Sequence, residues 1–338
     1  MIKVAINGFG RIGRRVFRLL HRHPQIQVVA INDLADGETL AHLLKYDSVH
    51  GIFPAEITFE NNQFYIDGKS LVLLNEKHPK SINWHSFNID FVIESTGKFK
   101  TKSELQNHIL NGANAVILSV PPIDDSIKTI VMGVNDALLD GTETIVSNAS
   151  CTTNNAAPMI QVIRDLCGID QAYITTVHSY TTDQSLHDQP HRDLRRARAA
   201  SQSIVPTTTG AAKALTKIFP ELSNAIGGCG IRVPVINGSL TDITCNVKES
   251  VSINEVNEAF KYAAQGDFKN IIQYTEVPLV SVDIIGNPHS CIFDAQMTSV
   301  IGNMVKIIGW YDNETGYSQR IIDLLCNLSE KKSVLSIK

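Results

Sequence analysis

The fold of this 338-residue chain is decided near its start, by the stretch KVAINGFGRIG at residues 3–13. Residues 3–7 are apolar and β-branched enough for a buried strand, and a glycine-rich turn follows at once. From Ile12 to Leu20, apolar residues recur at the spacing of one helix face. A second apolar run at 27–32 ends at Asp33, 20 positions beyond Gly13. This order of strand, glycine loop, helix, strand and acid indicates a dinucleotide-binding fold.

Each part of this stretch has a physical reason for binding a dinucleotide. Gly8, Gly10 and Gly13 let the backbone turn tightly and approach a pyrophosphate at the helix N-terminus. Asp33 can accept hydrogen bonds from the adenosine ribose hydroxyls, and its charge would repel a 2′-phosphate. We therefore expect NAD rather than NADP. The alternative, a plain tight turn, leaves the placement of Asp33 unexplained.

The rest of the first half alternates strands and helices. Further strands are predicted at 89–94, 115–119, 129–133 and 144–147, short hairpin strands at 57–59, 64–66 and 71–74, and a helix opened by the capping box Thr101–Glu104. This alternation favours a parallel, doubly wound sheet of the α/β Rossmann type.

The pattern changes after residue 150. Strands are predicted at 171–178, 239–247, 280–285 and 304–310, one clear helix at 254–265, and a last helix at 317–328. A long loop, 179–210, is dense in arginine, and loops of this length are usually functional. The second half is therefore expected to be α+β with a mostly antiparallel sheet, and the tail 331–338 to be loosely ordered.

Composition narrows the function classes. The chain has 30 lysines and arginines against 34 aspartates and glutamates, a net charge of −4, which gives no general attraction to nucleic acid or anionic membranes. Its six cysteines include no CxxC pair, so neither a zinc ribbon nor a redox motif is indicated, and no metal is expected. Few cysteines, no signal-peptide pattern and no bilayer-length apolar run predict a cytoplasmic protein.

The stretch SNASCTTN at residues 147–154 is the first candidate for chemistry. It lies between an apolar strand and an apolar helical run, so Cys151 is expected near a helix N-terminus. Unpaired N–H groups and the helix dipole there favour a thiolate, which is the reactive form. The alternative is a buried structural cysteine. The surrounding hydroxyls favour a site that holds an oxyanion.

His178 is the candidate partner of Cys151. It closes a predicted strand, where a side chain can point into a cleft, and an imidazole could deprotonate the thiol and later move the substrate's proton. Taken alone, a histidine is more often a hydrogen-bonded structural residue.

Two segments rich in arginine or threonine, and one solitary arginine, suggest anion sites. HRDLRRARA at 191–199 resembles a phosphate clamp, with a nucleic-acid patch and a subunit contact as alternatives. TTTG at 207–210 precedes a helix start and offers further donors. Arg232, in an apolar strand, is either a salt-bridged structural group or a substrate anchor, and we favour the anchor.

These parts fit one reaction. A thiolate adds to an aldehyde, hydride passes to nicotinamide while histidine takes the hydroxyl proton, and inorganic phosphate attacks the resulting thioester to give an acyl phosphate. One anion site would hold the substrate's own phosphate and the other the incoming phosphate, and the N–H of Cys151 could stabilise the oxyanion.

Over nearly its full length the chain resembles phosphorylating glyceraldehyde-3-phosphate dehydrogenases. The motifs that carry the resemblance are residues 7–14, 150–154, 176–181, 194–199, 206–213 and 310–314. The resemblance implies oxidation of glyceraldehyde 3-phosphate to 1,3-bisphosphoglycerate with NAD and phosphate, in glycolysis or gluconeogenesis. It implies an NAD-binding domain at 1–150, a catalytic and tetramerisation domain at 151–315, and a C-terminal helix at 316–338 that packs back on the first domain. A homotetramer is expected, with the arginine-rich loop at a subunit interface and neither nucleic acid nor membrane as a primary partner.

The resemblance also assigns residues. It implies Cys151 as nucleophile and His178 as base. Cofactor contacts are expected, beside the three glycines, from Arg11, Ile12, Asp33, Lys77, Ser119, Asn313 and Tyr317. Substrate and phosphate contacts are expected from Ser150, Cys151, Thr152, Thr181, Arg195, Thr209, Gly210 and Arg232.

The chain departs from the family pattern at a few positions. Asn155 stands where a second cysteine is common, which removes a route to an internal disulfide. Thr315 replaces a common tryptophan, Lys98 a usual apolar residue, and Cys229-Gly230 is unusual. The nearest alternative is the erythrose-4-phosphate enzyme, which shares the cysteine and histidine. A semialdehyde dehydrogenase would not explain two anion sites, and a non-catalytic dinucleotide- or RNA-binding protein would need no cysteine–histidine pair.

Overall fold

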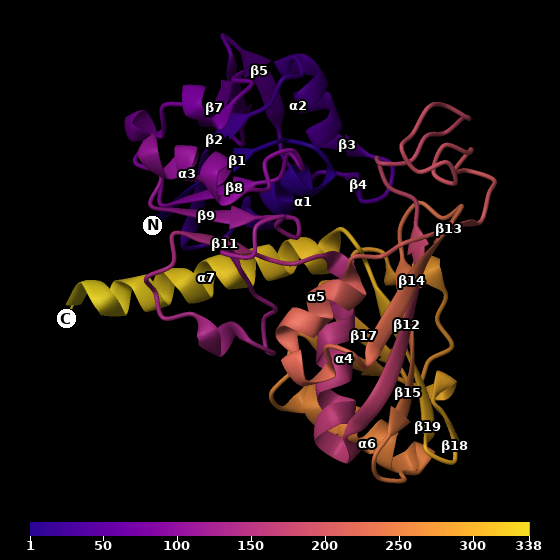
Figure 1. The fold of residues 1–338 in the computed structure, drawn as a ribbon. Coiled ribbons are helices and arrows are strands. Elements are labelled where there is room, and N and C mark those ends of the chain that lie inside the picture. Colours follow the sequence, from indigo (N-terminus) through magenta and orange to yellow (C-terminus); the bar gives the residue numbers. More distant parts are fainter. Residues whose placement is uncertain (338) are drawn as a thin grey trace. The chain divides into compact units, whose positions relative to one another are not determined.

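The computed structural model describes residues 1–337, which form two compact units (Figure 1). Unit 1 comprises Met1–Ile130, Asp136–Ala149 and the chain from Ser318 onward. Unit 2 comprises Val131–Asn135 and Ser150–Tyr317. The chain passes from unit 1 to unit 2 between Ala149 and Ser150, one residue before Cys151.

Unit 1 is built on a nine-stranded sheet. Its order is β10 (Lys128–Thr129), β11 (Ile145–Ser147), β9 (Ala115–Leu118), β8 (Phe91–Glu94), β1 (Ile2–Asn7), β2 (Ile26–Asn32), β7 (Lys69–Leu74), β6 (Gln63–Ile66) and β5 (Ile57–Glu60). From β10 to β7 all neighbours are parallel, and only β5–β6 and β6–β7 are antiparallel. The doubly wound parallel sheet predicted from the alternation of elements is confirmed, and the predicted hairpin strands extend this sheet.

Helices and a short ribbon complete unit 1. They are α1 (Arg11–Leu20), α2 (Gly37–Lys45), α3 (Lys102–Leu110), most of α7 (Thr315–Ile337), and the two-stranded β3 (Tyr46–Asp47) and β4 (Gly51–Ile52). The central strands β8 and β9 are buried along their whole length, as expected for parallel strands covered on both faces. The capping box that opens α3 is present, with Thr101 and Glu104 bonded reciprocally.

Unit 2 is built on an eight-stranded sheet. Its order is β13 (Val205–Thr207), β14 (Ile226–Val233), β12 (Ile169–Ser179), β15 (Ser239–Val247), β19 (Met304–Tyr311), β17 (Cys291–Asp294) and β16 (Ile272–Thr275), with β18 (Ser299–Ile301) also paired to β19. Two of its pairings, β12–β14 and β16–β17, are parallel, and the others are antiparallel. The mostly antiparallel second sheet is therefore confirmed. Helices α4 (Cys151–Cys167), α5 (Ala211–Ile218) and α6 (Ile253–Gln265) lie on one face of it (Figure 1).

Several local predictions were wrong. Residues 281–284 form a 3-10 helix instead of a strand, because the Asp283 carboxylate accepts from the Val280 N–H at 2.9 Å and closes a turn. The strand expected at 129–133 stops at Thr129, and the loop 179–210 contains β13. The tail expected to be loose continues α7 to Ile337, while Lys338 lies outside the described residues. Further 3-10 helices occur at Pro79–Ser81, Trp84–Phe87, Asp136–Leu138, Pro220–Leu222 and Ala295–Met297.

Candidate active site

Cys151 is the first residue of α4, as its sequence context predicted. Ser150 caps the helix, and its Oγ accepts from the Thr153 N–H at 3.1 Å. Ala149 has φ of +56°, a left-handed conformation that costs a non-glycine residue about 1–2 kcal/mol. Such strain is common at functional sites, and here it turns the chain immediately before the helix that carries the cysteine.

The structure brings His178 to Cys151. His178 is the tenth residue of β12, and its Nε2 lies 3.4 Å from the Cys151 Sγ. Its Nδ1 lies 2.7 Å from the Ser179 carbonyl oxygen. The imidazole is buried, and these two contacts hold it in one orientation. A pair 27 positions apart in the sequence is thus held at hydrogen-bonding distance.

The electrostatics of this pair differ from the expectation of a resting thiolate. Burial raises the pKa of the Cys151 thiol, although Arg232 and hydrogen bonds involving Thr152 lower it in part. Burial and the nearby Arg232 guanidinium lower the pKa of His178 to about 3. The surroundings therefore favour a neutral thiol beside a neutral imidazole, and proton transfer to His178 must accompany the attack of the sulfur.

Arg232 lies directly beside His178 because β14 pairs with β12 in a register that places these two residues opposite one another. Its Nη1 donates to the Ser179 carbonyl at 2.9 Å and also contacts the His178 Nδ1. Among residues 1–337 no carboxylate lies within ion-pair distance of Arg232, so nothing there supports the salt-bridged alternative. A half-buried guanidinium without a carboxylate partner, directly beside His178, can bind an anion.

The neighbours of Nδ1 decide what Nε2 can do. An arginine can only donate, so an Nδ1 that accepts from Arg232 requires the imidazole proton on Nε2. An Nδ1–H that donates to the Ser179 carbonyl leaves Nε2 free to accept the thiol proton. Base catalysis therefore requires the second tautomer, with Arg232 directed to its anion.

Tyr311 is a further residue of the site, and no role for it was predicted from the sequence. Its hydroxyl lies 2.9 Å from both the Thr152 and the Thr176 hydroxyls, and its ring meets His178 edge-on with centroids 5.9 Å apart. It joins the first turn of α4 to β12, the two elements that carry the reactive pair. The sequence feature that could have identified Tyr311 is its place in the 310–314 motif, two positions before Asn313.

Asn155 fixes the same helix one turn further on. Its buried amide nitrogen donates to the carbonyls of Ser290, Gly309 and Trp310 at 3.2, 3.3 and 3.3 Å. At this position of the chain the side chain therefore links α4 to β19 and to the segment before β17.

Asn313 is held in one orientation. Its Oδ1 accepts from the Ser179 and Ser239 hydroxyls at 2.8 and 2.9 Å, so the amide NH₂ points away from them and remains a donor. Asp312 organises the turn before it by accepting from the Glu314 and Thr315 N–H groups, both at 2.8 Å. Tyr317, the other predicted cofactor residue of this segment, is buried in unit 2.

The predicted phosphate residues are only partly gathered. Among the described residues, no hydrogen bond from Thr181, Arg195, Thr209 or Gly210 reaches Cys151 or His178. The Arg195 side chain is exposed, whereas the neighbouring Arg196 pairs with Asp183 and donates to the Thr207 hydroxyl at 2.9 Å. Arg196 thus closes the arginine-rich loop on β13, a role that the sequence did not distinguish from that of Arg195.

Unit 1 carries a separate pocket of about 210 Å³ where the strands β1, β2, β7 and β8 end. Its lining includes the predicted cofactor residues Gly8, Gly10, Asp33 and Lys77, and also the unusual Lys98. Gly8 has φ of +94°, and a Cβ there would lie 2.6 Å from the Thr96 nitrogen. Around Gly10 the space is open, so a ligand can approach the backbone.

The side chains at this pocket refine the predicted contacts. Asp33 already accepts from the Phe9 and Ala35 N–H groups, at 2.7 and 3.0 Å, which fixes its carboxylate at the glycine loop. The Arg11 guanidinium holds Asp47 by two hydrogen bonds, at 2.6 and 3.1 Å, so this side chain links α1 to the β3 segment. Ser119 follows β9 directly and is buried. Ile12 and Gly13 lie in the first turn of α1, and a Cβ on Gly13 would meet the Gly8 carbonyl.

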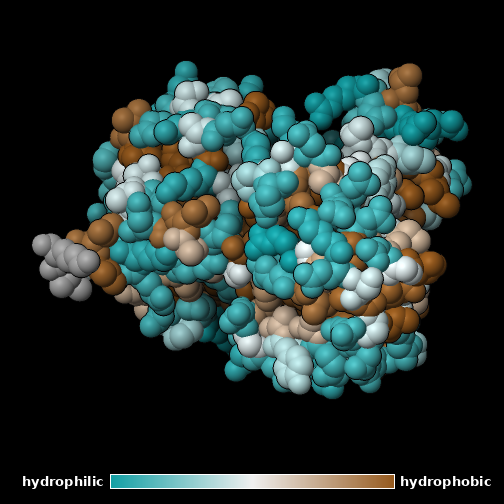
Figure 2. All heavy atoms as spheres, turned by 60° about the horizontal axis from the view of Figure 1, so that its bottom comes forward, coloured by the Kyte–Doolittle hydropathy of each residue, from teal (hydrophilic) through white to brown (hydrophobic). Residues whose placement is uncertain are grey.

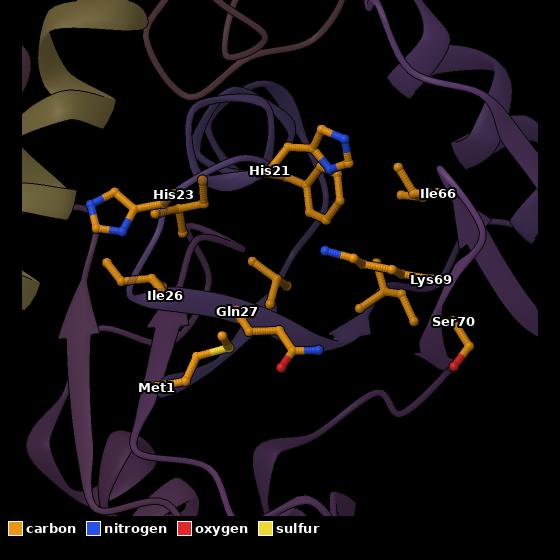
Figure 3. A pocket seen from close by; sticks show the side chains of 12 residues that line it. Met1, His21, His23, Ile26, Gln27, Ile66, Lys69 and Ser70 are labelled. Carbon is orange, nitrogen blue, oxygen red and sulfur yellow. The ribbon is translucent and has the colours of Figure 1, made fainter.

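A larger cavity of about 320 Å³ in unit 1 contains none of the predicted site residues (Figure 3). It lies among α1, β2, β6 and β7, with Gln27 and Lys69 reaching into it. Figure 2 shows hydrophilic and hydrophobic residues mixed over the visible surface. Within residues 1–337 no helix is long and apolar enough to cross a membrane, and no cluster of three or more His, Cys, Asp or Glu residues could hold a metal ion.

Comparison with known proteins places this chain in a class of dehydrogenases. Residues 2–102 match the family model for the glyceraldehyde 3-phosphate dehydrogenase NAD binding domain, and residues 150–313 match the model for its C-terminal domain. Glyceraldehyde-3-phosphate dehydrogenase of Geobacillus stearothermophilus is 49% identical over 332 residues, covering 98% of this chain and 99% of that protein. Glyceraldehyde-3-phosphate dehydrogenase 2 of Streptomyces avermitilis is 50% identical over 326 residues, covering 96% and 97%.

The chain therefore belongs to the glyceraldehyde-3-phosphate dehydrogenase family. It is an NAD-dependent dehydrogenase of that type, and the predictions of family, enzyme class and cofactor are confirmed.

Proposed function

We propose that this enzyme oxidises D-glyceraldehyde 3-phosphate to 1,3-bisphosphoglycerate with NAD and inorganic phosphate, in glycolysis or gluconeogenesis, through a thioester on Cys151. The observation that carries the proposal is the 3.4 Å approach of the His178 Nε2 to the Cys151 Sγ, with Nδ1 anchored 2.7 Å from the Ser179 carbonyl. A nucleophile, a base and a group that orients the base are the parts needed for covalent catalysis.

In the oxidative half, the Cys151 sulfur bonds to the aldehyde carbon while His178 takes the thiol proton and passes it to the carbonyl oxygen. The hemithioacetal carbon then loses its hydrogen as hydride, and His178 Nε2 takes the hydroxyl proton. Bound NAD supplies the hydride acceptor. The products of this half are a thioester on Cys151 and a protonated His178 that returns its proton to solvent.

In the second half, a phosphate oxygen attacks the thioester carbon and the carbon–sulfur bond breaks. The acyl phosphate leaves and the Cys151 thiolate is reprotonated. Negative charge develops on the carbonyl oxygen as the sulfur or the phosphate adds, and the N–H groups of the first turn of α4, which have no helical partners, can stabilise it. Attack by phosphate instead of water requires that phosphate be bound beside the thioester.

Anion contacts in this proposal come from Ser150, Thr152, Thr181, Arg195, Thr209, Gly210 and Arg232. Arg232 has the strongest structural support, because it is half-buried, lies opposite His178 in the sheet and has no carboxylate partner among residues 1–337. Some of these residues would bind the phosphate of the substrate, and the others would bind the incoming inorganic phosphate.

NAD is proposed to bind unit 1 at the 210 Å³ pocket, with the glycine loop and the start of α1 facing the pyrophosphate and Asp33 facing the adenosine ribose. Ile12, Lys77 and Ser119 complete the proposed contacts there. In unit 2 the free NH₂ of Asn313, fixed by two serine hydroxyls, suits the carboxamide oxygen of nicotinamide, with Tyr317 in the same segment.

We also propose a cytoplasmic homotetramer. The second face of the unit 2 sheet, opposite α4, α5 and α6, exposes Tyr173 of β12, Ile301 of β18 and Met304 of β19. Large apolar side chains on an open sheet face are typical of a subunit interface. A cytoplasmic location agrees with six cysteines that are all free in the structure.

The test is a comparison of kcat/KM for glyceraldehyde 3-phosphate and erythrose 4-phosphate, each with NAD and phosphate. We expect glyceraldehyde 3-phosphate to be preferred. Preference for erythrose 4-phosphate would reassign the substrate while retaining Cys151 and His178. Equal turnover of an unphosphorylated aldehyde would show that no site binds the substrate's phosphate.

A further inference from the structure

Beneath the dinucleotide pocket of unit 1 lies a carboxylate with no exposed surface. Glu94 is the last residue of β8, and its accessible area is 0%. Nothing in the proposed reaction uses it. Because a buried charge is costly unless it is fully hydrogen-bonded, the partners of Glu94 indicate what it does.

Every partner of Glu94 is a donor. Oε1 accepts from the Thr96 N–H at 2.9 Å and from the Thr96 hydroxyl, which itself accepts from the Lys98 N–H at 3.1 Å. Oε2 accepts from the Asn7 amide and lies 3.2 Å from the His108 Nε2. A protonated carboxyl would need an acceptor. The Thr96 N–H and the Asn7 amide offer none, and the Thr96 hydroxyl could accept only by giving up its own bond to Oε1.

On one side the donor direction is set by Trp84. The Trp84 indole N–H can only donate, and it lies 2.9 Å from the His108 Nδ1. His108 therefore accepts at Nδ1 and carries its proton on Nε2, directed at Glu94. A doubly protonated His108 would place two N–H groups against each other, so this fully buried imidazole is neutral.

On the other side the direction is set by the backbone of Glu76. Asn32 Oδ1 accepts from the Glu76 N–H at 2.7 Å, and its NH₂ donates to the Glu76 carbonyl at 2.9 Å. The same NH₂ donates to the Asn7 Oδ1 at 2.7 Å, which leaves the Asn7 NH₂ to face Glu94. Two chains of hydrogen bonds, each fixed at its outer end, thus converge on one acceptor.

We infer that Glu94 is a positioning residue for NAD: as a buried ionised carboxylate, it holds together the loops that form the dinucleotide pocket. Asn7, Asn32, Glu76 and Thr96 all line that pocket and follow or end four different strands. Glu94 bonds directly to Asn7 and Thr96 and reaches Asn32 through the Asn7 amide, so it connects three of these loop segments. The inference rests on the proposed assignment of this pocket to NAD.

Glutamine is the informative replacement because it keeps the shape of Glu94 and introduces one NH₂ group. Wherever that NH₂ points, it meets donors: Thr96 on one side, Asn7 and His108 on the other. Asn7 cannot reverse without opposing the Asn32 NH₂, and Asn32 cannot reverse without losing both bonds to Glu76. The strain therefore falls on the pocket loops.

The experiment measures NAD binding by isothermal titration calorimetry for the full-length wild type, Glu94→Gln and Glu143→Gln. Glu143 is a matched control: it is buried in the same unit and accepts from Lys128 at 2.6 Å, but does not line the pocket. We expect Glu94→Gln to raise the Kd for NAD about tenfold or more, the range for a mismatched buried hydrogen bond, and Glu143→Gln to leave it unchanged. The KM for NAD should rise in parallel, while iodoacetamide labels Cys151 at the wild-type rate.

The outcomes distinguish a failure of the positioning role of Glu94 from a failure of the assignment of the pocket to NAD. A Kd for Glu94→Gln equal to that of wild type, or an equal loss in both variants, overturns the positioning role. If Glu94→Gln does not fold, His108→Phe, which removes one donor and keeps a ring, is judged by the same criterion. If substitution of Asp33 leaves the Kd for NAD at the wild-type value, the assignment of this pocket to NAD is wrong instead.

Discussion

At the scale of single residues, the proposed catalysis depends on the contact between Cys151 and His178. Each of the two residues could be identified from the sequence as a candidate, because each stands at the end of an apolar segment beside hydroxyl-bearing residues. The pKa of the thiol was not predictable. Proximity to a helix N-terminus suggested a thiolate, but burial of the sulfur raises its pKa, and burial depends on segments far away in the sequence.

Removing the base tests the role of His178. His178→Asn retains a polar side chain but cannot take a proton, so kcat should fall by about 10²–10⁴-fold, the usual contribution of a general base. The rate at which iodoacetamide labels Cys151 should fall too. Circular dichroism serves as the control for folding. A variant with wild-type kcat would contradict the assignment.

Tyr311→Phe tests the link between α4 and β12. The change removes a hydroxyl bonded to Thr152 and Thr176 but keeps the ring against His178. Because two buried hydroxyls lose a partner, we expect a loss of about 1–3 kcal/mol in the free energy of unfolding, measured in urea. Thr176→Val in the Tyr311→Phe background should then cost less than it does alone, and additive losses would argue against the link.

At the scale of elements, periodicity predicted the strands because each central strand is a short apolar run. It failed where a side chain closes a turn, as Asp283 does, and where a distant segment orders a tail. Lys331 donates to the carbonyls of Asp136 and Leu139 at 3.2 and 2.5 Å, which helps hold α7 to unit 1. The Glu94 network could not be predicted from the sequence either, since its members come from segments as far apart in the chain as β1 and α3.

The link between α1 and the β3 segment should depend on pH. Burial raises the pKa of Asp47, but hydrogen bonds from the His50 and Val49 N–H groups and from Arg11 outweigh it and hold that pKa at about 2. A folded-state pKa below the unfolded value stabilises the protein above about pH 4, and the effect is lost as pH falls towards 2. Asp47→Asn should therefore unfold at lower urea than wild type at pH 7, and the difference should shrink by pH 3. A difference that stays constant with pH would contradict this.

Asp33 tests the choice of dinucleotide. Replacing its carboxylate with the hydroxyl of serine removes the repulsion of a 2′-phosphate and one acceptor for the ribose. In calorimetric titrations, the ratio of the Kd for NADP to the Kd for NAD should fall by about tenfold or more in Asp33→Ser, the equivalent of 1.4 kcal/mol. Wild type that binds both cofactors equally would show that Asp33 does not select NAD.

At the scale of the whole molecule, the predicted class followed from the order of motifs along the chain, and family membership confirms it. Assembly is a property that a single chain shows only through its surface. If the open sheet face of unit 2 joins subunits, sedimentation should give four chains per particle. Tyr173→Glu would place a charge in that interface and should lower the sedimenting mass, whereas a wild-type monomer would rule out the tetramer.

The thioester is the central claim, and a rapid-mixing experiment tests it most directly. Enzyme, NAD and glyceraldehyde 3-phosphate are mixed without phosphate, and NADH is followed by absorbance. We predict a burst of one NADH per Cys151, then almost no turnover until phosphate is added. Steady NADH formation without phosphate, or no burst from an enzyme that turns over once phosphate is present, would contradict the thioester and the bound phosphate that resolves it.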